Sequence, residues 1–152
     1  MLVGSFLKSK RQEIVTAKPW TSVADAMGLL ITNNIGCLPI LDDGGNLVGV
    51  VSDKDIFRHI HETGGRYQTD KVSDLMTTEV IIGLPTDDVS YITDVMDKAG
   101  IRHVLIVDGN RLIGLVSQRD IIKHQAHHKD VENRYLNLYM EGLGGRDMSG
   151  QV

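Results

Sequence analysis

The chain carries one short motif twice, as GVVSDKD at residues 49–55 and as GLVSQRD at residues 114–120. Both stretches have the pattern Gly-x-x-Ser-x-x-Asp. Upstream matches follow in the same order at nearly the same spacing: Pro19 with Pro85, Val23 with Val89, Leu30 with Met96, and Asp42 with Asp108. Composition alone does not produce such an ordered series, so the chain is an internal repeat. We define copy 1 as residues 13–61 and copy 2 as residues 79–128.

Each copy predicts a helix with one apolar face. In copy 1 the helix follows a polar cluster in which Thr21 or Ser22 is a suitable N-cap. Its apolar residues recur at helical spacing: Val23, Ala26, Met27, Leu30 and Ile31. The corresponding face in copy 2 is more diluted by polar residues: Val89, Ile92, Met96 and Ala99.

Short Val- and Ile-rich runs bounded by Asp, Gly and Asn predict a β-hairpin after each helix. The runs are 37–41 with 47–51, and 104–107 with 112–116. A shorter apolar piece precedes the helix of each copy, at 14–16 and 80–82, and a second helix begins at Ser52 or Ser117.

The predicted fold class is α+β, with two β-α-β-β-α repeats related by a pseudo-two-fold axis. Neither repeat is large enough to close a core alone, so we expect them to pack through their sheets. We place the first domain at 1–66 with the N-terminal segment, and the second at 67–128 with a linker helix at 72–76. A C-terminal helix and a frayed tail are expected at 129–152.

Composition narrows the class of protein. The 152 residues carry a formal net charge of −4 and a pI near 5.8, which disfavours a general nucleic-acid or membrane-surface binder. We find no apolar run long enough to span a bilayer and no signal peptide. The single Cys37 excludes an internal disulfide framework. We therefore expect a cytoplasmic protein.

The repeated motif, together with IGCLPI at 35–40, IRHVLI at 101–106 and VSDLM at 72–76, resembles a tandem pair of CBS domains, named after cystathionine β-synthase. The resemblance covers about residues 5–124 and is to the free-standing proteins of that family. It implies a regulatory module that binds AMP, ADP, ATP, NAD(H) or S-adenosylmethionine between the paired domains. It also implies a homodimer.

The resemblance implies two composite, unequal sites in which Asp binds the ribose. In the site expected to bind more strongly, adenine lies against Thr16, Ile35 and Gly36 near Cys37, and phosphates meet basic side chains. Its residues are Thr16, Ile35, Gly36, Cys37, Arg102, His103, Ser117, Arg119 and Asp120. The weaker site comprises Ile82, Ile101, Arg102, Ser52, Lys54 and Asp55.

The motif also has a purely local interpretation. A Ser at a helix start with an acid three residues later forms a capping box, which is a complete structural reason for both residues. Because Asp is shorter than Glu or Gln, we expect the carboxylates of Asp55 and Asp120 to point outward, where they suit ribose hydroxyls. Arg102 and His103 can equally be ordinary polar residues at a strand start.

We find no catalytic motif, so no enzymatic activity is expected. Five histidines lie near predicted helix ends, including the pair His124 and His128, but a helix C-terminus already favours histidine and we expect no metal site. The expected function is a non-enzymatic adenosyl-ligand sensor, with no required cofactor, that signals to an unknown regulated protein by a change in conformation or assembly. The alternatives are a constitutive scaffold and a metal- or redox-responsive adaptor.

Overall fold

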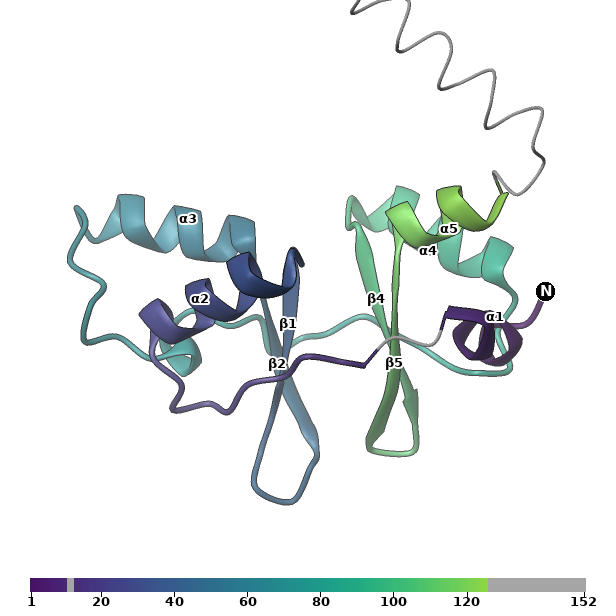
Figure 1. Ribbon diagram of the computed structural model, residues 1–152, viewed down its shortest axis with the longest axis horizontal. Helices are drawn as coiled ribbons and strands as arrows, with labels where there is room; N and C mark the ends of the chain where they lie inside the picture. The colour runs from purple at the N-terminus through teal and green to yellow at the C-terminus, as the bar shows by residue number, and fades with distance from the viewer. Residues whose placement is uncertain (11–12, 126–152) are drawn as a thin grey trace, which may run out of the picture. The chain divides into compact units, whose positions relative to one another are not determined.

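The computed structural model describes residues 1–10 and 13–125, and from residue 23 onward its helices and hairpins follow the predicted order (Figure 1). They are α1 (Val3–Lys10), α2 (Val23–Asn33), β1 (Cys37–Leu41), β2 (Leu47–Ser52), α3 (Asp53–Glu62), the 3-10 turn η1 (Val72–Asp74), β3 (Ile82–Gly83), α4 (Val89–Ala99), β4 (His103–Asp108), β5 (Arg111–Ser117) and α5 (Gln118–Gln125). Helices and hairpins are mixed along the chain, which confirms the α+β class. The chain divides into a unit of residues 1–116 and a second unit that begins at Ser117.

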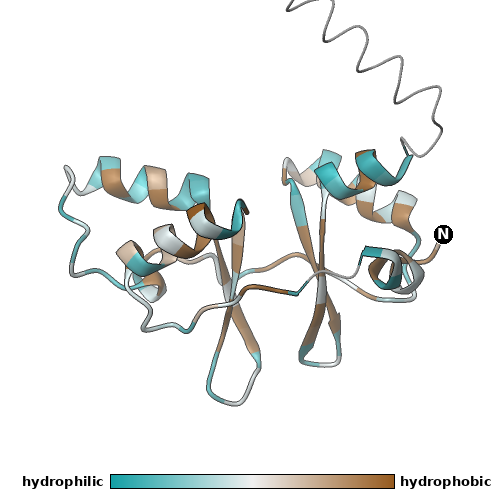
Figure 2. Cartoon of the chain, viewed as in Figure 1, coloured by the Kyte–Doolittle hydropathy of each residue, from teal (hydrophilic) through white to brown (hydrophobic). Residues whose placement is uncertain are grey.

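Each copy has its own sheet. β1 and β2 form an antiparallel pair in which Cys37 lies opposite Ser52, with a register shift between Ile40 and Leu41. The sheet of copy 2 has the order β3-β4-β5, with β3 parallel to β4. Figure 2 shows that the strands of both hairpins are mainly hydrophobic. The hairpins therefore supply much of the apolar surface that the helices cover.

The helix termini explain why the chain changes direction where it does. Ser22 caps α2 by accepting a hydrogen bond from the Asp25 amide at 3.0 Å, and Asp88 caps α4 in the equivalent place. Asn34 and Gly100 end these helices with φ values of 51° and 65°. Both are residue types that tolerate a left-handed conformation, and this lets the chain turn from the helix into the hairpin in each copy.

The predicted first strand of copy 1 is wrong. Residues 14–16 form no strand, and pairing is limited to a bridge in which the Ala17 amide donates to the Pro39 carbonyl at 3.0 Å and Leu41 donates to Ala17 at 2.9 Å. Pro19 follows two residues later and lacks an N–H, so it limits the pairing only on the side of the chain that follows Ala17. In copy 2 the strand exists but is limited to Ile82 and Gly83.

The predicted buried face of α2 is confirmed except at its edge. Val23, Ala26 and Leu30 are buried, whereas Ile31 is 76% exposed. Ile31 is eight residues from Val23, which places it about 80° around the helix from that residue. It therefore lies at the margin of the apolar stripe.

The N-terminal helix α1 contacts copy 2. The amides of Val3 and Gly4 donate to the carbonyls of Asp87 and Pro85, both at 2.9 Å, and Lys10 Nζ donates to the Leu115 carbonyl at 2.6 Å. Gly114 faces this helix closely: a Cβ on Gly114 would lie 2.5 Å from a methyl carbon of Leu7. A segment that precedes copy 1 thus covers β5 of copy 2 (Figure 1).

The linker between the copies contacts copy 1. Val72, within the predicted linker helix, is fully buried in the copy 1 core, and Thr77 and Val50 exchange backbone hydrogen bonds of 2.9 and 3.0 Å. A Cβ on Gly49 would lie 2.7 Å from the Met76 sulfur. The helix itself is a single 3-10 turn, η1.

Across residues 1–10 and 13–125, no helix is long and apolar enough to cross a membrane. The predicted C-terminal helix and tail at 129–152, and His127 and His128, lie outside the described residues.

Candidate ligand-binding site

The repeated motif occupies the junction between a strand and a helix in copy 1. Ser52 ends β2 in an extended conformation and caps α3, its Oγ accepting from the Asp55 amide at 3.1 Å. Asp55 Oδ2 in turn accepts from the Ser52 amide at 2.9 Å. The predicted capping box is therefore present, and we call residues 52–55 the copy 1 junction.

Residues 117–120, the copy 2 junction, repeat this geometry. The Asp120 amide donates to Ser117 Oγ at 3.0 Å, and the Ser117 amide donates to Asp120 Oδ2 at 3.1 Å. The expectation that the two carboxylates point outward is wrong for one oxygen of each. An Asp at this position is long enough to reach the backbone, because the extended cap residue brings its N–H toward the first helical turn.

Gly36 lies against the copy 1 junction. Its carbonyl accepts from the Asp53 amide at 2.9 Å, next to the point where Cys37 pairs with Ser52. A Cβ on Gly36 would lie 3.2 Å from Asp53 Oδ2 and 3.4 Å from His103 Cε1. Glycine therefore allows the start of β1, the first turn of α3 and the start of β4 to approach closely.

An ion pair joins the two copies at this place. Arg102 Nη2 lies 3.1 Å from Asp53 Oδ1, which also accepts from the Lys54 amide at 2.7 Å. Both charged side chains are more than half exposed, at 59% and 52%. Sequence reasoning missed Asp53 because the motif leaves its position open, although the contrast with Gln118 in copy 2 was visible.

The pKa of the Cys37 thiol is shifted by burial and by the charged side chains around the copy 1 junction. Burial is the main cause that raises its pKa to about 12, Asp53 and Asp55 add to the increase, and Arg102 opposes it. A thiol with this pKa is protonated at neutral pH and is a poor nucleophile. This environment does not favour the redox-responsive alternative at Cys37.

The structure brings together Gly36, Cys37, Arg102 and His103 of the predicted stronger site, but beside Asp53 and Asp55 of copy 1. Thr16, Ile35 and Ile101 are partly buried, while Lys54 is exposed and Ile82 is 47% exposed. Ser117, Arg119 and Asp120 belong to the second unit. Their grouping with Thr16 and Ile35 stays a prediction.

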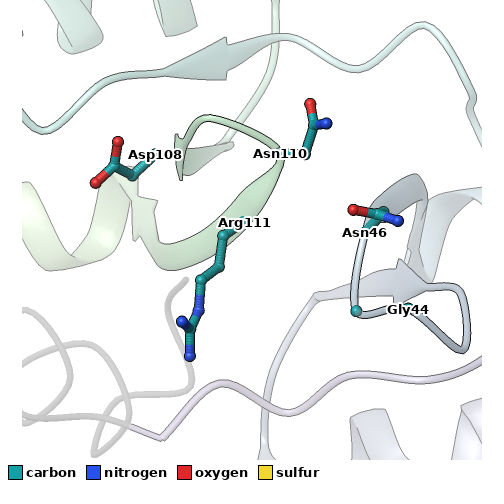
Figure 3. Close-up of a pocket in the computed structure, with 6 residues that line it drawn as sticks. Gly44, Asn46, Asp108, Asn110 and Arg111 are labelled. Carbon is teal, nitrogen blue, oxygen red and sulfur yellow. The ribbon is translucent and has the colours of Figure 1, made fainter.

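A separate pocket of about 420 Å³ lies at the turns of the two hairpins (Figure 3). It is lined by Gly44, Gly45, Asn46, Asp108, Asn110 and Arg111. Asn46 directly precedes β2, whereas the copy 1 junction lies at the other end of that strand. None of the predicted site residues lines this pocket.

No group of three or more His, Cys, Asp and Glu side chains within residues 1–10 and 13–125 could hold a metal ion.

Comparison with known proteins gives one consistent result. The CBS domain matches this chain twice, at residues 4–62 and 72–127. CBS domain-containing protein YhcV of Bacillus subtilis (strain 168) is 29% identical over 131 residues, which cover 86% of this chain and 92% of that protein.

Two solved structures with similar folds contain adenosine compounds. The CBS domain pair of protein MJ0100, in complex with 5′-methylthioadenosine and S-adenosyl-L-methionine, has a TM-score of 0.74 and 29% identity, covering 84% of this chain and 97% of that chain. CBSX2 in complex with AMP has a TM-score of 0.71 and 29% identity, covering 84% and 98%. Because the family matches most of the sequence in two tandem segments, this chain belongs to the CBS domain family.

Proposed function

We propose that this chain is a non-enzymatic regulatory protein that binds an adenosine-containing ligand at its strand-to-helix junctions. The observation that carries the proposal is that the same Ser–Asp pair closes both junctions, with Arg102 of copy 2 reaching the junction of copy 1. The adenosine complexes of the MJ0100 domain pair and of CBSX2 support this ligand class.

The copy 1 junction offers the chemistry that a ribose needs. Asp55 Oδ2 is used by the capping box, but Oδ1 accepts no hydrogen bond from any described residue and is available to a sugar hydroxyl. Ile82 and Ile101 would supply apolar walls for adenine. Arg102, His103 and Lys54 would contact groups attached at the 5′ position of the ribose.

The second site would use Asp120 and Ser117 for the ribose. Thr16, Ile35, Gly36 and Cys37 would form its adenine wall, and Arg119 would join Arg102 and His103 near the phosphates. This grouping follows the family resemblance. Within residues 117–120, Ser117 and Asp120 repeat the capping geometry of the copy 1 junction.

The output would be a population shift. A ligand that contacts both copies stabilises the arrangement for which it has the higher affinity, and a regulated protein or an assembly change would read that arrangement. We include a cytoplasmic homodimer in the proposal. Phe57 on α3 is 78% exposed, so a substitution there leaves the core unchanged and can test this part of the proposal. Sedimentation velocity of Phe57→Glu should then show loss of the dimer.

Thermal unfolding with AMP, ADP, ATP, NADH and S-adenosylmethionine tests the binding function. A ligand at 100 times its dissociation constant adds about 2.7 kcal/mol to the folded state. We expect at least one ligand to raise the Tm of the wild type and Asp120→Ala to remove most of that rise.

The matched control is Asp74→Ala. Asp74 Oδ2 accepts from the Lys71 amide at 2.9 Å, so the control removes the same kind of capping bond in the linker, away from both junctions. It should lower the basal Tm and keep the ligand-induced rise. If no ligand raises the Tm and the purified protein carries no nucleotide, the scaffold alternative replaces this proposal.

A further inference from the structure

The Asp53 carboxylate occupies the position beside Arg102 that the proposed function gives to the 5′ substituent of a ligand. Its Oδ1 lies 3.1 Å from the Arg102 guanidinium and accepts from the Lys54 amide at 2.7 Å. Its Oδ2 faces Gly36, at 3.2 Å from where a Cβ would stand. Asp53 therefore already supplies Arg102 with the negative charge that a phosphate would bring.

A phosphate at this junction would meet two carboxylates. Asp55 follows Asp53 by two residues, and its Oδ2 is fixed by the Ser52 amide. Like charges brought together are unfavourable, and a phosphate would also have to displace Asp53 from Arg102. An adenosyl compound without phosphate meets neither obstacle.

The pKa of the Cys37 thiol follows the same charge balance. After burial, Asp53 and then Asp55 are the next causes of its raised pKa, and the opposing effect of Arg102 is smaller than either. At the start of β1, the two carboxylates thus outweigh the guanidinium.

Copy 2 lacks this acid. The residue after the motif Ser is Gln118, which is uncharged, so the two junctions differ by one negative charge at an equivalent position.

We propose that Asp53 is a specificity residue that makes the copy 1 junction prefer adenosyl ligands without a 5′ phosphate, such as thioethers or sulfonium compounds, over nucleotides. This inference rests on the proposed function. Asp53 acts as a built-in anion that competes with a ligand phosphate for Arg102.

The test compares AMP with 5′-methylthioadenosine, which share the adenosine half and differ in charge at the 5′ position. Isothermal titration calorimetry of the full chain, carrying Asp120→Asn to weaken the other site, should show tighter binding of 5′-methylthioadenosine. Adding Asp53→Asn should tighten AMP binding about tenfold and change 5′-methylthioadenosine binding less than about twofold. Asp53→Gln places in copy 1 the residue that copy 2 has at Gln118, and it should have the same effect on both ligands. This second variant keeps the test valid if Asp53→Asn does not fold.

The matched control is Glu62→Gln, which removes one negative charge from the exposed far end of α3. It should leave the ratio of the two affinities unchanged. The inference is overturned if Asp53→Asn and Asp53→Gln leave AMP binding unchanged, if they tighten both ligands equally, or if the Asp53 form prefers AMP. In those cases the measured binding still upholds the proposed function. Failure of both ligands to bind any form, including the chain with Asp120 intact, overturns the proposed function together with the inference.

Discussion

Gly49 and Gly114 begin the same motif but are covered by different parts of the chain. Gly49 packs against Met76 and Thr77 of the linker, whereas Gly114 packs against Leu7 of α1. Each covering segment precedes one copy in sequence and contacts the other. The segment that repeats in sequence is therefore not the segment that folds together. Each copy is covered by the segment that leads into the other copy, not by its own.

The largest effect should come from removing the anchors of these segments. Phe6 of α1 is 2% exposed, and Val72 of the linker is fully buried. Phe6→Ala should lower the free energy of unfolding by about 3–5 kcal/mol, and Val72→Ala should lower it by about 2 kcal/mol, because both leave cavities. Urea unfolding measures both. A cost below about 1 kcal/mol for Phe6→Ala would mean that α1 adds little to the folding of the unit.

A smaller loss of stability is expected from substitutions at the start of each copy, where the two copies differ. Ala17 and Gly83 occupy equivalent positions, and a Cβ on Gly83 would lie 2.7 Å from Ile92 Cδ1 and 2.8 Å from Ile106 Cδ1. Gly83→Ala should therefore destabilise by about 1–3 kcal/mol through overpacking. Ala17→Gly should cost about 1–2 kcal/mol, since it frees the backbone and removes a buried methyl group. A cost near zero for Gly83→Ala in urea unfolding would show that the side chains around Gly83 repack freely.

The starts of β1 and β4 carry different residues, because Cys37 in copy 1 is matched by His103 in copy 2. The pKa of Cys37 rises from 9.0 to about 12, chiefly through burial. Between these values the unfolded chain loses the thiol proton while the folded chain keeps it, so stability falls as pH rises through this window. At pH 10 the loss should be about 1.4 kcal/mol, and Cys37→Ala should not show it. Parallel pH profiles of the two proteins would refute this assignment.

The smallest effect concerns the ion pair that distinguishes the junctions. Arg102 and Asp53 are both more than half exposed, so their coupling should be about 0.2–1 kcal/mol. A double-mutant cycle with Arg102→Ala and Asp53→Asn measures it. The coupling energy should decrease as the salt concentration is raised. A coupling energy that does not change with salt would indicate that contacts other than charge join the two side chains.

Local patterns predicted most of the fold. Spacing, caps and turn residues placed four helices and both hairpins, and the Ser–Asp spacing predicted both capping boxes because all of these are short-range properties. The linker helix proved to be one 3-10 turn, and the strand predicted at residues 14–16 is absent, with pairing reduced to the bridge at Ala17.

Long-range features of the candidate site were less predictable. The Asp53–Arg102 pair depends on how two distant segments meet, and this leaves no periodic signal in the sequence. The docking of α1 on copy 2 was hidden for the same reason, since a helix of eight residues does not show which surface it will cover.

The placement of α1 also sets an order of events during synthesis. Lys10 and the Leu115 carbonyl that it contacts are 105 residues apart, so the helix leaves the ribosome long before its binding surface exists. Copy 1 can acquire its covering segment as soon as residue 77 has emerged, because chains fold from the N-terminus as they are made. Helix α1 therefore docks late, and a nascent chain that stops before β5 still has the apolar residues of α1 uncovered.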